Sequence, residues 1–209
     1  MNKSSKTGLD NFGLLTSIIK IITDLNLKTN KINTSQIQVL EEYQTGKVAV
    51  TLNKKGHASY EIEHPKAWDK IKYKEASEEI IKTSDAFIFG SLVARDAVSK
   101  KSLFDYLESA NYKIFDVNLR SPHYKKETLT ELMQKADFIK FNDEELYEIS
   151  SFLGSTYKNL EQNIHFIAQK TNTKSICVTK GEHGAVLLYN NQLFYNSGYL
   201  ITVADTVGS

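Results

Sequence analysis

The chain has 209 residues, of which 41% are hydrophobic and 24% are charged, a composition typical of a globular protein with one good-sized domain. Lysine and arginine number 26 against 25 aspartate and glutamate residues, so the net charge of +1 gives no field that would attract nucleic acid or an anionic membrane. The polar start lacks a signal-peptide apolar region, and no apolar run approaches the roughly 18 to 20 residues of a membrane span. We therefore expect a cytoplasmic protein whose partners are small molecules or other proteins.

The single cysteine, Cys177, lies in an apolar run at residues 175–179. One cysteine excludes a disulfide framework and favours a reducing compartment. Because no cationic residue flanks it in the sequence, we interpret Cys177 as a buried, inert thiol and not as a nucleophile. The histidines show no metal-ligand spacing and are expected to be surface or core residues: His57, His64, His123, His165 and His183.

The first predicted elements are a helix and a pair of short strands. Apolar residues at helical spacing over 14–25 predict an amphipathic helix that ends near residue 26. Residues 47–52 and 58–62 are short runs joined by a turn at 53–56, which is the pattern of an antiparallel hairpin. Strands of this kind, inside an otherwise alternating pattern, often form a lid or a small extra sheet. A helical stretch that ends before Asp85 follows.

From residue 86 onward, strands and helices alternate. Apolar runs predict strands at 86–89, 114–117, 137–141 and 175–179, and helical spacing predicts helices over 103–110, 129–136, 146–153 and 160–168. Two further runs joined by Asn190-Asn191 predict a hairpin at 185–189 and 193–195. Repeated strand-helix units indicate an α/β fold with a mostly parallel, doubly wound sheet and right-handed crossovers.

Polar residues follow two neighbouring strands of the predicted sheet. Asp116, Asn118 and Arg120 recur at every second position, and in extended chain such residues point to one side. The next strand ends in Asn142, with Glu145 three residues later. Because ligands of open α/β sheets bind beyond the carboxyl ends of the strands, we predict one shared site. The alternative interpretation is a solvated loop followed by a capped helix start.

A glycine-containing segment, Thr179-Lys180-Gly181-Glu182-His183-Gly184, follows the last strand of the alternating series. Its glycines would let the backbone approach a phosphate or a base closely. The alternative is a plain turn between two strands. The segment is not a Walker loop, because no Gly-Lys-Ser/Thr follows it.

Four motifs, in their order along the chain, resemble those of the ribokinase (PfkB-type) family of carbohydrate kinases, and of its fructokinase-like branch in particular. The motifs are D-x-N-x-R at 116–120, N-x-x-E at 142–145, T-x-G-x-x-G at 179–184 and D-T-x-G at 205–208. Smaller similarities are the G-x-D-x-x-G segment at 8–13, Thr45-Gly46, Ser59 to Ile62, and Ala67-Trp68-Asp69. The resemblance implies a ribokinase-like fold in one partial sugar-kinase domain over 1–209, with residues 45–63 as lid strands. An unrelated doubly wound protein would have to match all four motifs by chance.

The resemblance also implies roles for individual residues. Arg120 would place a phosphate group, or the anionic environment of the sugar, through its planar fork. Gly208 would belong to an anion pocket at a helix start. Asn142, Thr179, Gly181 and Gly184 would bind the nucleotide, with ATP as the phosphoryl donor. Asp116 and Asn118 would shape the site without touching the substrate.

Metal ions are implied in the same way. Glu145 would act on Mg²⁺ through bound waters, which this ion usually retains. Asp205 and the carbonyl of Val207 match positions that hold a monovalent cation such as K⁺ in some family members.

Trp68 belongs to one of the segments that resemble the fructokinase-like branch. Simple packing in the core is an equally good explanation for a tryptophan at this position.

Two parts of the family pattern are missing from the 209 residues. The family signature D-T-x-G-A-G-D ends in the aspartate that acts as general base, whereas this sequence reads D-T-V-G-S at 205–209. The strands and Gly-Gly motif that hold the sugar are also not found before residue 7. A missing general base costs about 10² to 10⁴ in rate, and a missing anion-pocket donor about 10² to 10³. We therefore expect a natural full-length enzyme that phosphorylates a hexose-like sugar, and a 209-residue chain with little activity by itself.

Two alternatives remain open at this point. The chain could be a non-catalytic module that binds nucleotide or sugar and regulates a partner, or a kinase whose acceptor is a 2-keto-3-deoxy acid or a nucleoside. The lid strands are also a candidate contact for a homodimer.

Overall fold

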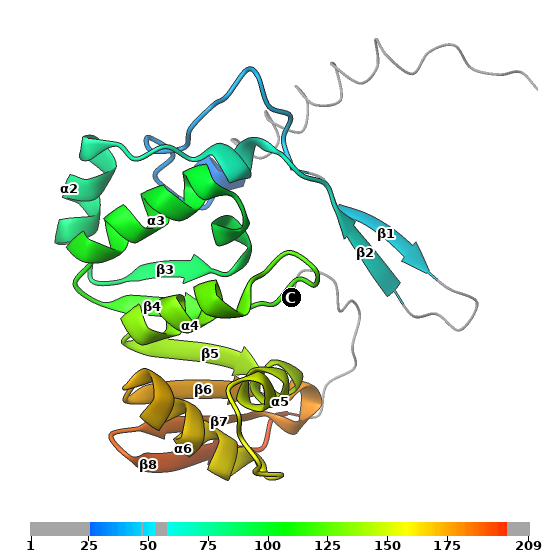
Figure 1. Ribbon diagram of the computed structural model, residues 1–209. Coiled ribbons are helices and arrows are strands. Elements are labelled where there is room, and N and C mark those ends of the chain that lie inside the picture. Colours follow the sequence, from blue (N-terminus) through cyan, green and yellow to red (C-terminus); the bar gives the residue numbers. More distant parts are fainter. Residues whose placement is uncertain (1–25, 47, 53–57, 200–209) are drawn as a thin grey trace, which may run out of the picture. The chain divides into compact units, whose positions relative to one another are not determined.

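A computed structural model describes residues 26–46, 48–52 and 58–199, and the side chains at 48–52 and 58–60 are not part of that description (Figure 1). The chain divides into two compact units, Met1–Lys72 and Tyr73–Ser209. The single domain over 1–209 stays a prediction, and we describe each unit by itself.

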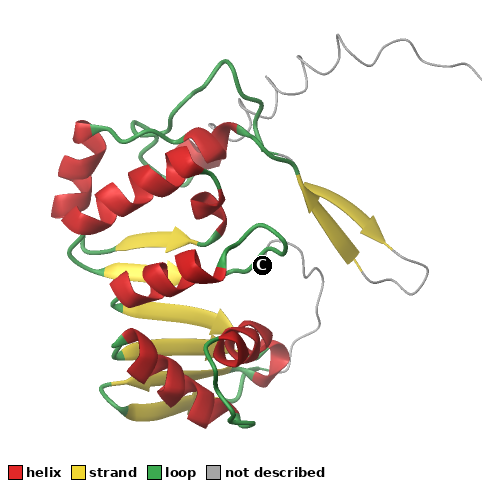
Figure 2. Ribbon diagram, viewed as in Figure 1, coloured by secondary structure: helices red, strands yellow, loops and turns green. Residues whose placement is uncertain are grey.

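The first unit contains a two-stranded antiparallel sheet (Figure 2). Strand β1 (Val48–Leu52) pairs with β2 (Ala58–Ile62) so that Val48 lies opposite Ile62. This pairing confirms the antiparallel strands predicted from the sequence, while their connecting turn lies outside the described residues. The predicted first helix also lies almost wholly outside them, although residues 26–29 are helical.

Trp68 packs against Gly46 in the first unit. Trp68 belongs to the short 3₁₀ helix η1 (Ala67–Lys70), and a Cβ built on Gly46 would lie 2.5 Å from its ring. Asp69 of the same helix is fully buried, and its Oδ2 accepts a hydrogen bond from the Lys66 backbone N–H at 2.8 Å. The Thr45-Gly46 and Ala67-Trp68-Asp69 segments therefore pack together, and the close approach of the ring explains why position 46 is glycine.

The second unit contains a six-stranded sheet in the order β3-β4-β5-β6-β7-β8. The strands are β3 (Phe87–Gly90), β4 (Lys113–Asp116), β5 (Phe138–Asn142), β6 (Ser175–Thr179), β7 (Ala185–Tyr189) and β8 (Gln192–Asn196). Strands β3 to β6 run parallel, and β7 and β8 continue the sheet antiparallel to β6 and to each other. The mostly parallel sheet and the final hairpin were both predicted, and both are confirmed.

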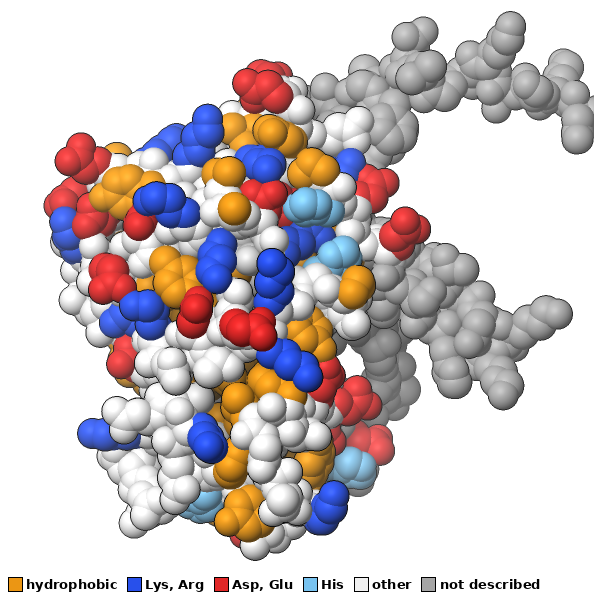
Figure 3. All heavy atoms as spheres, in the orientation of Figure 1, with side chains coloured by type: hydrophobic (Ala, Val, Ile, Leu, Met, Phe, Trp, Pro, Cys, Tyr) orange, Lys and Arg blue, Asp and Glu red, His pale blue; other side chains and the backbone are white. Residues whose placement is uncertain are grey.

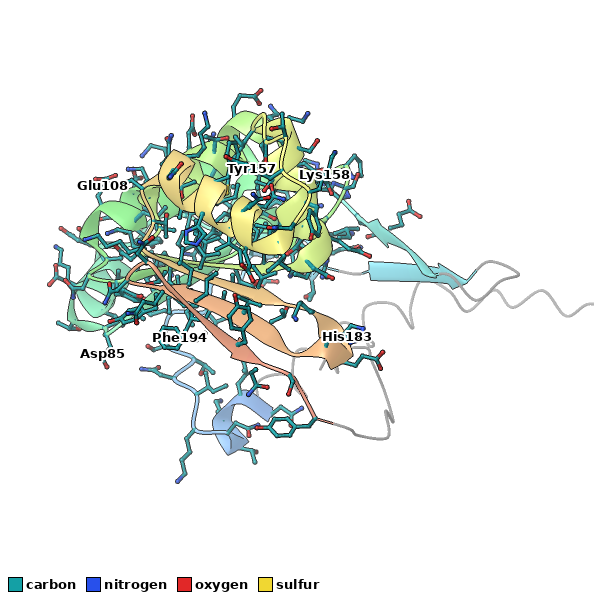
Figure 4. All side chains as sticks on the ribbon, turned by 90° about the horizontal axis from the view of Figure 1, so that it is seen from below. Asp85, Glu108, Tyr157, Lys158, His183 and Phe194 are labelled. Carbon is teal, nitrogen blue, oxygen red and sulfur yellow. The ribbon has the colours of Figure 1, made fainter. Side chains whose placement is uncertain are left out.

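Five α-helices and two 3₁₀ helices accompany the sheet in the described part of this unit. They are α2 (Glu75–Thr83), η2 (Leu92–Arg95), α3 (Ala97–Ser109), α4 (Lys126–Lys135), α5 (Asp143–Phe152), α6 (Leu160–Thr171) and η3 (Gly181–His183). Helices α3 to α6 lie on one face of the sheet (Figures 1 and 4). None of the helices within the described residues is long and apolar enough to cross a membrane.

The hydrophobic core lies between these helices and the sheet. The strands contribute a cross-strand row of buried side chains, Phe89, Phe115, Ile139, Ile176 and Leu188. The helices contribute Leu107, Leu129, Leu132, Met133, Leu146, Ile149, Ile164 and Ile167, each at most 1% exposed. Burial of this many apolar side chains is the main force that holds the strand ends in place.

The opposite face of the sheet is less completely covered. Ile88 is 67% exposed, and Phe194 projects from this face, away from α5 and α6 (Figure 4). Cys177 lies in the same row as Phe194 and is half-buried, and burial raises the pKa of its thiol. Its neighbour on the adjacent strand β5 is Lys140, a cation that lies far from Cys177 in the sequence and was not expected there. The effect of burial on the pKa exceeds that of Lys140. The thiol is therefore less buried than predicted, although the raised pKa of its side chain supports the interpretation as an inert group.

Charged side chains of both signs are interspersed over the face shown in Figure 3. Several form exposed ion pairs, such as Lys101 with Asp105 at 2.6 Å and Lys135 with Glu108 at 2.5 Å. Lysine stems also cover aromatic rings on this unit, with the Lys100 ammonium 5.3 Å from the Phe104 ring centre. The described residues on this face form no single-sign patch, which agrees with the balanced composition.

Candidate functional site

Strands β3 to β6 are parallel, so their carboxyl ends meet at one edge of the sheet. Strand β4 ends at Asp116, β5 at Asn142 and β6 at Thr179. Asn142 and Thr179 lie directly opposite each other in the β5–β6 register. The structure thus brings together residues from three motifs that are far apart in the sequence.

The loop after β4 departs from the predicted alternation. The strand ends at Asp116, and Asn118 has a φ of 42°, in the left-handed region that asparagine tolerates better than most residues. The expectation that Asp116, Asn118 and Arg120 point to one side depended on extended chain through all three, and that premise is wrong. Asp116 instead pairs with Lys140 on the neighbouring strand, at 3.1 Å between Oδ1 and Nζ.

Three hydrogen bonds hold residues 117–119 of this loop, and each comes from a different element. The Val117 N–H donates to the Lys140 carbonyl on β5 at 3.0 Å. The Ser91 hydroxyl, just after β3, donates to the Asn118 carbonyl at 3.3 Å. The Leu119 N–H donates to Oε1 of Glu145 on α5 at 2.7 Å. The loop therefore has a defined path although it has no regular secondary structure.

Arg120 follows these three anchors and is exposed. Its Nη1 donates to the Leu119 carbonyl at 3.0 Å, and its own carbonyl accepts from the His123 N–H at 2.7 Å. The remaining guanidinium N–H groups have no acceptor within the described part of the chain, so they are available to an anion. The phosphate-placing role of Arg120 stays a prediction.

Helix α5 begins with a capping box formed by Asn142 and Glu145. The Asn142 Oδ1 accepts from the Glu145 N–H at 2.7 Å, and the Glu145 Oε2 accepts from the Asn142 N–H at 2.8 Å. The capped helix start proposed as the plain alternative is therefore confirmed. The capping box is compatible with ligand binding by Asn142, because the Nδ2 of this residue has no hydrogen bond to the described residues and can still donate to a ligand.

Glu145 is only 5% exposed, and each of its two oxygens accepts a backbone N–H. A carboxylate has about four lone-pair positions, so about two remain for other donors. Direct coordination of a metal ion would compete with both backbone contacts, whereas a metal-bound water could donate to a remaining lone pair. The residue therefore fits the water-mediated Mg²⁺ role, which stays a prediction.

The glycine segment after β6 forms a tight turn. Thr179 Oγ1 donates to the Phe141 carbonyl at 3.3 Å, and the Lys180 N–H donates to the Gly184 carbonyl at 2.7 Å. Gly181 and Gly184 have φ values of 55° and 81°, so both occupy conformations that favour glycine. The plain-turn interpretation is confirmed. Gly181 is exposed and its N–H remains available to a ligand, whereas the half-buried Gly184 donates its N–H to the Gly181 carbonyl at 3.2 Å.

Gly184 has a second reason to be glycine. A Cβ at this position would lie 1.9 Å from the Asn196 carbonyl oxygen and 2.5 Å from the Gly198 nitrogen. A Cβ at Gly181 would meet no atom within 4 Å. The first glycine is therefore required by its backbone conformation alone, and the second also by close contact with the segment that follows β8.

Other predicted site residues lie outside the described part of the chain. Asp205, Val207 and Gly208 belong to this group, so their cation and anion roles stay predictions. Within the described residues, no group of three or more histidine, cysteine, aspartate or glutamate side chains is placed to hold a metal ion. His183 is exposed on η3, at the end of the sheet that carries the glycine turn (Figure 4).

Sequence reasoning missed two contributors to the site, Ser91 and the Leu119 N–H. Ser91 lies two residues after the predicted strand at 86–89, at the edge where ligands of parallel sheets bind, and that position was an available signal. The Leu119 N–H is a backbone group, so no residue type could have revealed it.

The family model described as pfkB family carbohydrate kinase matches residues 24–209. Fructokinase from Vibrio cholerae O395, solved with fructose, ADP and calcium ion, is 19% identical, with a TM-score of 0.70 over 90% of this chain and 61% of that chain. Fructokinase from Xylella fastidiosa with bound ATP is 18% identical, with a TM-score of 0.73 over 87% of this chain and 57% of that chain.

A third solved structure has a different acceptor. Aminoimidazole riboside kinase from Salmonella enterica, complexed with aminoimidazole riboside and an ATP analog, is 18% identical, with a TM-score of 0.67 over 88% of this chain and 61% of that chain. At these identities the likeness shows a shared fold. The chain spans about three fifths of the length of these structures.

Proposed function

The chain belongs to the pfkB family of carbohydrate kinases, and we propose that the complete enzyme transfers the γ-phosphoryl group of ATP to a hydroxyl of a hexose-like sugar. The observation that carries this proposal is the convergence of three motifs at one edge of the parallel sheet. Asn142 and Thr179 face each other there, and the loop that carries Arg120 is hydrogen-bonded to the first turn of α5 through Glu145.

The chemistry available at this edge suits phosphoryl transfer, which depends on positioning and electrostatic stabilisation. The Asn142 amide and the Gly181 N–H would donate to phosphate oxygens, and the Arg120 guanidinium would add a charged donor. Mg²⁺ supplies charge neutralisation between the phosphates when it is bound, and Glu145 would hold it through water. Asp205 and Val207 would hold a monovalent cation such as K⁺.

We expect the 209-residue polypeptide to bind ATP with little turnover. The resemblance places the general base two positions beyond Ser209, so this group is not among the 209 residues. Its loss alone would lower the rate by about 10² to 10⁴.

The test compares the 209-residue chain with the product of the whole genomic reading frame that contains it. Both are assayed by calorimetry for ATP binding and by coupled ATP consumption with fructose and other hexoses. Fructose-dependent turnover confined to the whole product would support both parts of the proposal. Brisk turnover by the 209-residue chain would refute the expected inactivity, and absence of ATP binding by both polypeptides would refute the kinase assignment.

A nucleoside acceptor is the second candidate, because a riboside kinase matches this chain as well as the fructokinases do. Profiling the whole product against hexoses, ribosides and 2-keto-3-deoxy acids separates these acceptors. ATP binding without turnover on any of them would instead indicate a regulatory module.

The proposal also includes a cytoplasmic location and a homodimer formed through β1 and β2. Light scattering coupled to size-exclusion chromatography would measure the mass in solution. A monomeric mass at working concentration would refute the dimer.

A further inference from the structure

Glu145 occupies an unusual position between two motifs. It is the last residue of N-x-x-E, yet its Oε1 accepts the N–H of Leu119, which lies inside D-x-N-x-R, at 2.7 Å. Its Oε2 closes the capping box with Asn142 at 2.8 Å. A single buried carboxylate therefore joins the loop after β4 to the first turn of α5.

We propose that Glu145 is a positioning residue, which sets the path of the loop after β4 and thereby the place of Arg120. This proposal rests on the proposed function, in which Arg120 meets the phosphate groups. The physical basis is the strength of hydrogen bonds from N–H groups to a carboxylate, which are shorter and stronger than those between neutral groups. Because the Glu145 side chain is 5% exposed, water competes poorly for these contacts.

The neighbouring anchors show why this contact is decisive for Arg120. Val117 and Asn118 are held by a backbone carbonyl and by a serine hydroxyl, at 3.0 Å and 3.3 Å. The Glu145 contact is the shortest of the three and the one nearest to Arg120. The Arg120 side chain donates to the carbonyl of Leu119, and the N–H of the same residue, Leu119, donates to Glu145.

The main variant is Glu145→Gln, which keeps the size of the side chain but replaces one acceptor oxygen with an amide donor. The matched control is Glu144→Gln, which removes the same charge from the same helical turn. Glu144 is exposed, and it makes no hydrogen bond or ion pair in the described part of the chain. The two variants therefore separate the contact from the change in charge.

The first readout needs no ligand. Amide hydrogen exchange at Leu119, measured by NMR, is expected to accelerate at least tenfold in Glu145→Gln and to stay unchanged in Glu144→Gln. If Leu119 exchanges equally fast in the wild-type chain and in Glu145→Gln, the proposal is wrong.

The second readout separates positioning from metal binding. ATP affinity is measured with Mg²⁺ and with EDTA, in the wild type, Glu145→Gln, Arg120→Ala and the double variant. We expect Glu145→Gln to weaken ATP binding about tenfold in EDTA, where no metal contributes, and to have no further effect there once Arg120 is removed. Unchanged ATP binding in EDTA, or a loss in EDTA that adds fully to the loss from Arg120→Ala, would overturn the proposal.

The wild-type chain provides a further test if Glu145→Gln does not fold. In the wild-type chain, the Leu119 amide should exchange at least tenfold more slowly than an unprotected amide, because its acceptor is the buried Glu145 carboxylate. Exchange at the unprotected rate would overturn the proposal. If the wild-type chain binds no ATP, the proposed function fails, while the exchange results still decide whether Glu145 positions the loop.

Discussion

The two glycines of the turn after β6 provide a sharp test of the site, because they share a positive φ but differ in their surroundings. Gly181→Ala would place a Cβ in open space, so its cost is the left-handed conformation alone, about 1–2 kcal/mol. Gly184→Ala would place a Cβ 1.9 Å from the Asn196 carbonyl oxygen, in a conformation with φ 81° and ψ −138°. The contacting atoms belong to backbone and cannot rotate away, so we expect a cost of at least about 3 kcal/mol.

The assay is urea unfolding of both variants and the wild type, followed by the circular dichroism of the sheet. With a total stability of about 5–15 kcal/mol, Gly184→Ala should shift the midpoint strongly, and Gly181→Ala should shift it modestly. If the two variants lose the same free energy of unfolding within about 0.5 kcal/mol, the close approach of Gly184 to the segment after β8 is not present in solution.

Three further predictions concern stability. Gly46→Ala should displace the ring of Trp68, the only tryptophan of the chain, and lower the free energy of unfolding by about 1–3 kcal/mol. The tryptophan fluorescence should change with it, and an unchanged emission spectrum would contradict this prediction. Leu132→Ala, at a fully buried position, should lower the free energy of unfolding in urea by about 2–5 kcal/mol. Ile88→Ala, on the less covered face of the sheet, should lower it by less than about 0.5 kcal/mol, and equal losses would refute the assignment of the core. Hydrogen bonds from Ser109, Tyr73 and Lys82 lower the pKa of Glu78 to about 2. The stabilising contribution of Glu78 should therefore be complete above pH 4.5 and disappear as the pH falls toward 2. A Glu78→Gln variant should lack this part of the pH dependence of the free energy of unfolding.

The order of the elements could be predicted from the sequence because periodicity is a local property. The strands at 175–179 and 185–189 were predicted at the bounds that the structure shows. The turn between β7 and β8 was predicted from Asn190-Asn191, and both residues have the positive φ that a tight hairpin turn requires. Asn142 and Glu145 were identified as a capping pair from their spacing alone, and the capping box is present.

The details of the site could not be predicted in the same way, because they depend on contacts between distant residues. The alternation of Asp116, Asn118 and Arg120 failed because β4 ends at Asp116, where its pairing with β5 also ends. The register of β5 against β6 places Lys140 beside Cys177, which no local pattern reveals. The Leu119 contact with Glu145 spans 26 residues and involves a backbone donor.

The charge of the first turn of α5 indicates how nucleotide and metal would be arranged at this edge. A helix N-terminus normally attracts an anion, but Asp143, Glu144 and Glu145 already place three carboxylates there. A phosphate group that approached α5 alone would be repelled, whereas the turn after β6 offers the Gly181 N–H and the cation Lys180. On the proposed function, the phosphates should therefore contact the glycine turn and the Asn142 amide, and the carboxylates of α5 would favour a bound Mg²⁺. ATP should then bind more weakly when Mg²⁺ is removed, and neutralising Asp143 should reduce that difference.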